Sequence, residues 1–238
     1  MTETTSPLAA LRDSKLLKTD ALIDGKWVAG KERFDVCDPA TRAKLADVPN
    51  LGRSDAALAI AAADKAWPAW RAKTGKERSI ILRKWFDLLM ENQEDLGRIM
   101  TAEQGKPYPE AKGEVAYAAS FVEWFAEQAK RVNGETLPTF NNNQRVMVLK
   151  QSIGVCAAIT PWNFPLAMIT RKVAPALAAG CPVVVKPAEL TPLTALAAAE
   201  LALRAGIPPG VLNVLTADTR NSIEIGYGRV YGSGQGRG

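Results

Sequence analysis

The 238-residue sequence contains no histidine. Without imidazole side chains it cannot build a Ser–His or Cys–His nucleophile pair, and it lacks the commonest zinc ligand. Its three cysteines are an odd number without CxxC spacing, which predicts neither a disulfide framework nor a metal cluster. We therefore expect no bound metal, and any chemistry on this chain has to use other side chains.

The sequence also lacks long apolar runs and blocks of like charge. No apolar stretch approaches the ~20 residues that span a bilayer, and polar residues 2–6 do not resemble a signal peptide. The 30 basic and 25 acidic side chains give a net charge of +5 and are scattered, unlike a nucleic-acid arm or a membrane anchor. We expect a cytoplasmic protein with no nucleic-acid or membrane partner.

None of the three cysteines has the surroundings of a nucleophile. Cys156 lies within the apolar run Ile153–Ile159, and Cys181 precedes Pro182 and three valines. Because a reactive thiolate needs a nearby cation or a helix N-terminus, these two cysteines are predicted to be small core residues. Cys37 stands beside acidic residues and is no better a candidate.

The residues that are present predict a chain with a sizeable core, since 47% of them are hydrophobic. Before residue 133 the pattern is mostly helical. After short strands at 22–28 and 34–39, we expect helices from Ser54 to Pro68, after Thr74, over 92–103 and from Pro109. A hairpin of 136–140 and 145–151 follows Asn133-Gly134 and should project from the regular regions.

From Ser152 onward strands and helices alternate, as in a parallel sheet with right-handed crossovers. Strands are expected at 154–159, 183–186 and 211–215, and helices over 166–179, kinked at Pro175, and from a cap at Thr191 to Gly206. The predicted fold class is α/β, with an N-terminal helical region packed on an incomplete parallel Rossmann-like sheet and a β-hairpin arm. The predicted divisions are 1–132 (helical), 133–151 (hairpin), 152–226 (first half of the sheet) and 227–238 (Gly-rich tail).

One polar motif directly follows the first of these strands. It reads Thr160-Pro161-Trp162-Asn163-Phe164-Pro165. Ligands of open parallel sheets bind beyond the carboxyl ends of the strands, where such a loop lies. The Asn163 amide is suited to donate a hydrogen bond to an oxygen that gains negative charge. The alternative is an ordinary turn in which Asn163 caps the next helix, and spacing alone does not separate the two.

A second motif, Lys186-Pro187-Ala188-Glu189, follows the next strand. An acidic residue after the second strand of a dinucleotide fold can accept hydrogen bonds from ribose hydroxyls. The alternative interpretation is a surface ion pair between Lys186 and Glu189, which contributes little stability. The sequence has no GxGxxG fingerprint, because the glycines at 232, 234 and 236 follow no apolar strand and precede no helix.

Together the two motifs resemble the aldehyde dehydrogenase family, as do Glu103–Pro107 and Pro175–Gly180 in the same order, and the resemblance covers about residues 20–226. It implies that Asn163 belongs to the oxyanion hole and that Thr160, Pro161 and Trp162 lie beside the dinucleotide. It further implies that the segment Lys186, Pro187, Ala188 and Glu189 holds the adenosine ribose. A glutamate there repels a 2′-phosphate, so we expect NAD, with NADP less favoured.

The segment Met168–Lys172 is similar to succinate-semialdehyde dehydrogenases, in which the arginine helps to bind the substrate carboxylate. That similarity implies a carboxylate-binding role for Arg171, which guanidinium chemistry suits through bidentate hydrogen bonds. Without it, an exposed helix charge is the simpler interpretation.

The final residues, from Tyr227 onward, do not resemble the family. We therefore expect roughly the first half of an aldehyde-oxidising enzyme, without the family's catalytic cysteine and general-base glutamate, so that the isolated chain is inactive. The last strands are expected to lack sheet partners, and the intact parent is expected to be a homo-oligomer that uses the hairpin as its arm. The competing hypothesis is a non-catalytic dinucleotide-binding or assembly module.

Overall fold

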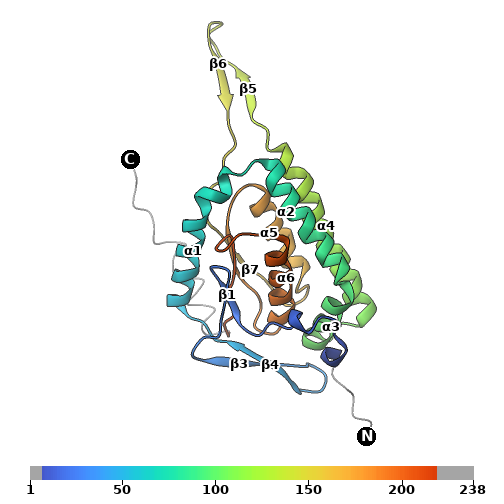
Figure 1. Cartoon of the computed structure of the whole chain (residues 1–238). Coiled ribbons are helices and arrows are strands. Elements are labelled where there is room, and N and C mark those ends of the chain that lie inside the picture. The colour runs from blue at the N-terminus through green and yellow to red at the C-terminus, as the bar shows by residue number, and fades with distance from the viewer. Residues whose placement is uncertain (1–6, 219–238) are drawn as a thin grey trace.

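The computed structural model describes residues 7–218. Its helices are α1 Arg53–Ala72, α2 Gly75–Glu91, α3 Gln93–Gln104, α4 Tyr108–Gln128, α5 Ala167–Ala178 and α6 Pro192–Ala205, with 3-10 turns at Pro7–Ala10, Ser14–Leu16 and Ala129–Arg131. Its strands are β1 Ala21–Ile23, β2 Lys26–Val28, β3 Arg33–Cys37, β4 Lys44–Pro49, β5 Glu135–Pro138, β6 Arg145–Val148, β7 Cys156–Ile159, β8 Val183–Lys186 and β9 Leu212–Val214. Helices surround the central strands, and the β5–β6 hairpin projects far from them (Figure 1).

The central sheet has five strands in the order β2-β1-β9-β8-β7. Strands β7, β8 and β9 run parallel to one another, while β1 pairs antiparallel with β9 and with β2. The predicted α/β class with a partly parallel sheet is therefore confirmed. The four predicted divisions of the chain stay a prediction, and the Gly-rich tail lies outside the described residues.

The pairing of β9 with the N-terminal hairpin corrects one expectation. We expected the last strands to lack partners, but Leu22 of β1 lies opposite Val214 of β9. The side chain of Asn213 stabilises this strand pairing, because its Oδ1 accepts a hydrogen bond from the backbone amide of Asp24 at 2.9 Å. At the other end of the sheet, β7 pairs with β8 alone among residues 7–218.

Helix α1 corrects a second expectation. Pro68 was predicted to stop this helix, but the helix continues through it to Ala72. The extension places Trp70 in the core at 1% exposure, where its indole N–H donates to the Leu177 carbonyl at 3.1 Å. Burial of a tryptophan is worth several times the stability of one lost helical hydrogen bond, so tertiary packing outweighs the local penalty.

Sequence signals at other helix ends are confirmed. Thr74 caps α2 through a reciprocal pair of hydrogen bonds with Glu77. Gly105 ends α3 with a φ of +78°, a conformation that glycine adopts without strain. The apolar residues Val115, Ala118 and Val122 of α4 are fully buried, whereas Phe121 and Phe125 at the same helical spacing are partly buried. These features could be predicted because each depends on residues within one or two helical turns of one another.

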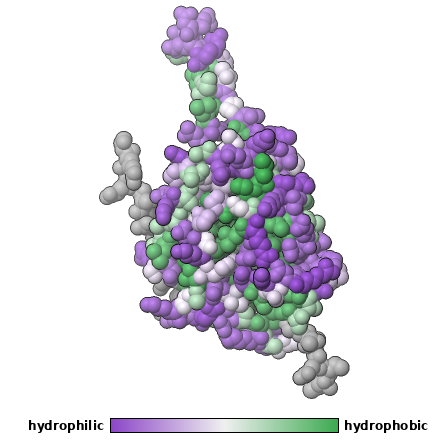
Figure 2. All heavy atoms as spheres, viewed as in Figure 1, coloured by the Kyte–Doolittle hydropathy of each residue, from purple (hydrophilic) through white to green (hydrophobic). Residues whose placement is uncertain are grey.

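The hairpin leaves its side chains largely exposed. Every residue of β5 and β6 is exposed, including the apolar Leu137, Val146 and Met147. Figure 2 shows apolar residues along the stem of the hairpin and polar residues at its tip. The predicted β-hairpin is therefore present, with an apolar surface that the described chain does not cover.

Candidate active site

The structure brings the two polar motifs together. Strands β7 and β8 are parallel neighbours in which Ile159 lies opposite Lys186. The Thr160 amide donates to the Lys186 carbonyl at 3.1 Å, which joins the first residue after β7 to the last residue of β8. Both motifs thus lie at the carboxyl edge of the sheet, where open α/β sheets bind their ligands.

The loop after β7 exposes its polar and aromatic side chains. Thr160 is buried, whereas Trp162 is 53% exposed and Phe164 is 40% exposed. Asn163 is exposed as well, and its side-chain amide has no hydrogen-bond partner within residues 7–218. An amide that the protein leaves unpaired is available to donate to a ligand oxygen.

Asn163 does not cap the following helix, which removes the alternative interpretation of this residue. No local side chain caps α5. Instead, the first amides of the helix, those of Leu166 and Ala167, donate to Oε1 of Glu114 at 3.0 and 3.3 Å. A glutamate from α4 therefore fills the position that the sequence offered to Asn163.

The loop after β8 places a lysine and a carboxylate side by side. The Lys186 ammonium lies 3.5 Å from Oε2 of Glu189, with the lysine side chain only 6% exposed and the glutamate side chain 34% exposed. Burial lowers the pKa of Lys186, and the Glu189 carboxylate opposes that shift. The expected ion pair is present, but its lysine is buried rather than on the surface.

Helix α6 is also capped from a distance. Thr191 occupies the predicted cap position, yet its side chain makes no capping hydrogen bond. The Glu103 carboxylate accepts the amides of Leu193 and Thr194 at 2.6 and 2.8 Å. Burial raises the pKa of Glu103 to about 7, although the hydrogen bonds that it accepts act in the opposite direction.

Arg171 lies on α5, in the turns that follow the Asn163 loop. Its side chain is exposed, and its guanidinium carbon lies 5.2 Å from the ring centroid of Phe121 on α4. This position is compatible both with a helix surface charge and with a group that meets a substrate beside the sheet edge.

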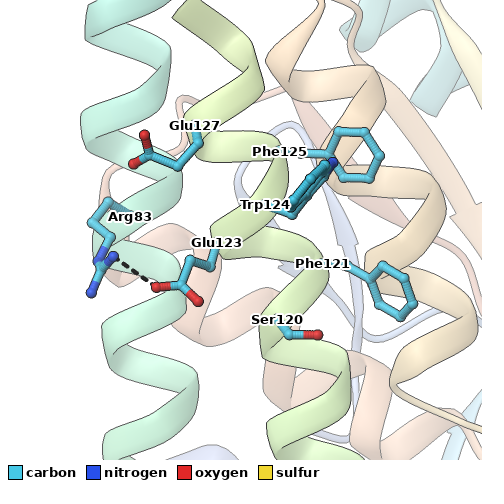
Figure 3. A pocket seen from close by; sticks show the side chains of 7 residues that line it. All are labelled: Arg83, Ser120, Phe121, Glu123, Trp124, Phe125 and Glu127. Atoms are coloured by element: carbon cyan, nitrogen blue, oxygen red, sulfur yellow. Dashed lines mark hydrogen bonds and ion pairs between the residues drawn. The ribbon is translucent and has the colours of Figure 1, made fainter.

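A hollow between α2 and α4 lies apart from the two motif loops. Figure 3 shows the Arg83–Glu123 ion pair on one side of it and aromatic rings on the other. Its lining residues are Arg83, Ser120, Phe121, Glu123, Trp124, Phe125 and Glu127. Arg171 lies over the ring of Phe121, but none of the candidate residues of the two motif loops lines this hollow.

Residues 27–225 match the family described as the aldehyde dehydrogenase family. The chain belongs to the aldehyde dehydrogenases. It is 59% identical over 208 residues to a succinate-semialdehyde dehydrogenase (NADP+) of Escherichia coli, across 87% of this chain and 43% of that protein. It is 56% identical over 208 residues to a 3-sulfolactaldehyde dehydrogenase of Pseudomonas putida, across 87% and 43%.

Solved structures agree with this assignment. A crystal structure of succinate-semialdehyde dehydrogenase from Burkholderia pseudomallei matches with a TM-score of 0.87 at 59% identity, over 89% of this chain and 44% of that one. The chain thus spans less than half the length of these aldehyde dehydrogenases. The expected family and the predicted resemblance over about 20–226 are confirmed.

The described cysteines of this aldehyde dehydrogenase chain are poorly placed for nucleophilic attack. Cys156 begins β7 and Cys181 precedes β8, so both lie at the strand ends opposite the motif loops, about 10 Å or more away along the strands. Burial raises the pKa of Cys156 to about 11, which keeps its thiol protonated at neutral pH. Cys37 is exposed on β3.

Two further findings concern residues 7–218. No group of histidine, cysteine, aspartate and glutamate side chains is arranged there to hold a metal ion. None of the helices described for this aldehyde dehydrogenase chain is long and apolar enough to cross a membrane.

Three polar residues beside the motif loops had no predicted role, although two of them belong to the Glu103–Pro107 motif. They are Glu103, Lys106 and Glu114, which reach the starts of α5 and α6 from the corner between α3 and α4. A signal for Glu114 was present, because it falls within the helical spacing of buried Ala111 and Ala118. A charged residue on an apolar stripe predicts a buried partner.

Proposed function

We propose that this chain supplies the oxyanion donor and part of the dinucleotide site of an NAD-dependent aldehyde dehydrogenase that oxidises succinate semialdehyde to a carboxylate. The observation that carries the proposal is the unpaired amide of Asn163 beside the Lys186–Glu189 pair at one sheet edge. Family membership supports aldehyde oxidation as the reaction. The roles of individual residues follow from their chemistry.

Asn163 is assigned to the oxygen of the aldehyde carbonyl. When a nucleophile adds to the carbonyl carbon, the oxygen gains negative charge, and a donor held at that point stabilises the charge. The exposed side chain of Asn163 can reach a ligand without breaking any hydrogen bond within residues 7–218. The neighbouring residues Thr160, Pro161 and Trp162 are assigned to the face of the dinucleotide, because the indole of Trp162 offers a large exposed flat surface.

The segment Lys186, Pro187, Ala188 and Glu189 is assigned to the adenosine ribose. A carboxylate and an ammonium group side by side fit a pair of hydroxyls, since one accepts and the other donates hydrogen bonds. The dinucleotide, when bound, accepts the hydride that leaves the aldehyde carbon. Lys186 and Glu189 bind and orient that group and take no part in the bond changes.

We propose NAD as the preferred dinucleotide on the basis of Glu189. A carboxylate that accepts from the ribose hydroxyls repels a 2′-phosphate, which favours NAD over NADP. Two observations limit the expected preference. The Lys186 ammonium partly compensates the charge of Glu189, and the Escherichia coli relative is named for NADP+. We therefore expect a modest preference for NAD rather than exclusion of NADP.

Arg171 is assigned to the acidic end of the substrate. The named substrates of two relatives, succinate semialdehyde and 3-sulfolactaldehyde, each carry an anionic group at the far end from the aldehyde. A guanidinium binds such groups through paired, charge-assisted hydrogen bonds. Arg171 lies on α5, which begins directly after the Asn163 loop, so one helix links the proposed donor to the proposed clamp.

The nucleophile and the general base are proposed to come from sequence that this chain does not contain, since it spans about 43% of its relatives. We therefore expect no turnover when the purified 238-residue chain is mixed with succinate semialdehyde and NAD or NADP. Absorbance of the reduced nicotinamide measures this. Turnover that is lost on mutating Cys37, Cys156 or Cys181 would show that one of them is the nucleophile after all.

The role of Asn163 is tested in a completed enzyme, which joins residues 1–217 of this chain to the remaining C-terminal segment of the Escherichia coli relative. Replacing an oxyanion donor costs about 10²–10³ in kcat, so Asn163→Ala should lower kcat by that factor with little change in KM. Glu110→Ala, at an exposed residue of α4 outside the proposed site and the hairpin, is the control. An unchanged kcat in Asn163→Ala would refute the proposed function.

The hairpin is proposed to be an oligomerisation arm of the parent enzyme. Its stem exposes the apolar side chains of Leu137, Val146 and Met147. Exposure of such a patch to water is unfavourable, and a second copy of the chain can cover it. The same surface favours the competing hypothesis of a non-catalytic assembly module. Light scattering on the completed enzyme tests the arm, because Met147→Glu should lower its molecular mass, while kinetics decide between enzyme and module.

A further inference from the structure

Lys106 stands at the corner between α3 and α4 and reaches into the loop that carries Asn163. Its ammonium forms an ion pair with Oε2 of Glu114 and lies 3.3 Å from the backbone carbonyl oxygen of Asn163. The same group lies 4.2 Å from the ring centroid of Phe164. The side chains of Lys106 and Glu114 are only 11% and 1% exposed, so water does not compete strongly for these contacts.

Glu114 extends this contact to the end of the loop. While its Oε2 holds Lys106, its Oε1 accepts the amides of Leu166 and Ala167. The loop from Asn163 to Ala167 is therefore held at its start by a lysine and at its end by a glutamate, and these two side chains form an ion pair with each other. Pro165 within it restricts the backbone further.

The charges of this network are matched. A buried carboxylate without a partner is costly, but here the ammonium and the N-terminus of α5 both compensate it. A cation–π contact and a charge-assisted hydrogen bond then hold the Phe164 ring and the Asn163 carbonyl group, both directly C-terminal to the Asn163 Cα. A hydrogen-bond donor is useful to a transition state only when its direction is set beforehand.

We propose that Lys106 and Glu114 are positioning residues, which act through the Asn163 loop to aim the Asn163 amide at the carbonyl oxygen of the aldehyde. The inference rests on the proposed role of Asn163 as oxyanion donor. It assigns a task to the Glu103–Pro107 motif, whose lysine has no contact with the dinucleotide segment 186–189 in the described residues.

The loop itself is tested on the 238-residue chain by hydrogen exchange and mass spectrometry. Lys106→Met removes the charge and the donor at nearly constant length. We expect amide exchange over 160–170 to become about tenfold faster or more, from the loss of a charge-assisted hydrogen bond, with exchange over 192–205 unchanged. Lys106→Arg should restore protection, because it keeps the cation and its donors.

Lys112→Met is the matched control. Lys112 lies on α4, as Glu114 does, but it forms its ion pair with Glu94 of α3, at 3.6 Å. The Lys112→Met substitution should leave exchange over 160–170 unchanged. If Lys106→Met loses protection throughout the chain, Glu114→Gln decides the question, because it keeps an acceptor for α5 while removing the charge that holds Lys106. Unchanged exchange over 160–170 in that variant would overturn the proposal.

The catalytic consequence is tested in the completed enzyme. Lys106→Met should lower kcat by about tenfold to a hundredfold with KM nearly constant, as expected when a donor is misplaced. In the Asn163→Ala background the same substitution should lower kcat no further. An equal loss of kcat in both backgrounds overturns the proposal. An unchanged kcat in the Asn163→Ala variant alone refutes the proposed function, and the hydrogen-exchange result then shows whether Lys106 still holds the loop.

Discussion

The junctions that connect β7 to α5 and β8 to α6 are built alike and differ in charge. In both, a short loop with proline leads from a strand to a helix whose first amides are capped by a distant glutamate. Glu114 caps α5 and Glu103 caps α6. Glu114 forms an ion pair with Lys106, whereas no salt bridge to Glu103 is found within residues 7–218.

The two junctions also differ in how far they expose their side chains. The first junction exposes Trp162, Asn163 and Phe164 and keeps its capping charge compensated. The second buries Pro187 and Ala188, and burial raises the pKa of its capping Glu103 to about 7. A compensated charge fixes a polar, exposed loop, while an uncompensated one makes the second junction sensitive to pH.

Removing the uncompensated cap should have the largest effect. Glu103→Ala leaves the buried amides of Leu193 and Thr194 without an acceptor, at about 1–3 kcal/mol each. We therefore expect the free energy of unfolding to fall by roughly 2–6 kcal/mol in chemical denaturation. Glu103→Gln retains one acceptor oxygen and should lose clearly less. Equal losses in the two variants would mean that side-chain volume, not capping, is what matters.

Arg171→Ala tests whether the first junction also selects the substrate. Loss of a charge pair at a desolvated site costs about 2–5 kcal/mol, so kcat/KM of the completed enzyme for succinate semialdehyde should fall by more than tenfold. An uncharged aliphatic aldehyde should be affected far less. The ratio of the two losses is decisive, because equal losses would leave Arg171 as a helix surface charge beside Phe121.

The pH dependence of stability should sharpen the contrast between the two caps. A glutamate titrates near 4.5 in an unfolded chain, and Glu103 titrates near 7 in the folded one. Between these values the folded state keeps a proton that the unfolded state has lost, so the free energy of unfolding should fall as the pH rises from about 4.5 to 7, by up to roughly 3 kcal/mol.

Glu103→Gln provides the control for this dependence. Because it cannot titrate, its free energy of unfolding should follow a flatter curve over the same pH window. Urea denaturation at a series of pH values measures both proteins. Parallel curves for the parent chain and Glu103→Gln would show that other groups cause the slope.

Most strands and helix ends could be predicted because local residues decide them, but strand β4, Lys44–Pro49, was not expected. Strand β8 is buried on all four residues, and its apolar run from Val183 identified it with its correct bounds. The prediction that α1 ends at Pro68 was wrong, because burial of Trp70 favours continuation of the helix. The two caps could not be predicted in detail, since Glu103 lies 90 residues before Leu193 and only the fold brings them together.

The candidate site was predictable to the same degree. The motifs after β7 and β8 were found because polar residues directly follow apolar strands, and their adjacency follows from a parallel sheet. The role of the residues that hold the Asn163 loop was not predicted, because the sequence shows Lys106 only as a residue next to the glycine that ends a helix. Its role depends on the packing of α4 against α5, which no local pattern records.

Glu189→Ser should have the smallest effect, and it tests whether the second junction binds the ribose of the dinucleotide as proposed. Hydrogen bonds to a charged acceptor are worth ~1.5–3 kcal/mol, or roughly ten- to a hundredfold in affinity. In the completed enzyme, the substitution should raise KM for NAD by about that factor and leave kcat nearly unchanged, because the ribose lies away from the bond changes.

Use of NADP should improve relative to NAD, since the carboxylate of Glu189 that repels the 2′-phosphate is gone. The buried Lys186 then remains to attract the 2′-phosphate. Steady-state kinetics with both dinucleotides, with Glu110→Ser on α4 as a control, measure the ratio. An unchanged preference between NAD and NADP would remove Glu189 from the cofactor site and leave it as the ion-pair partner of Lys186.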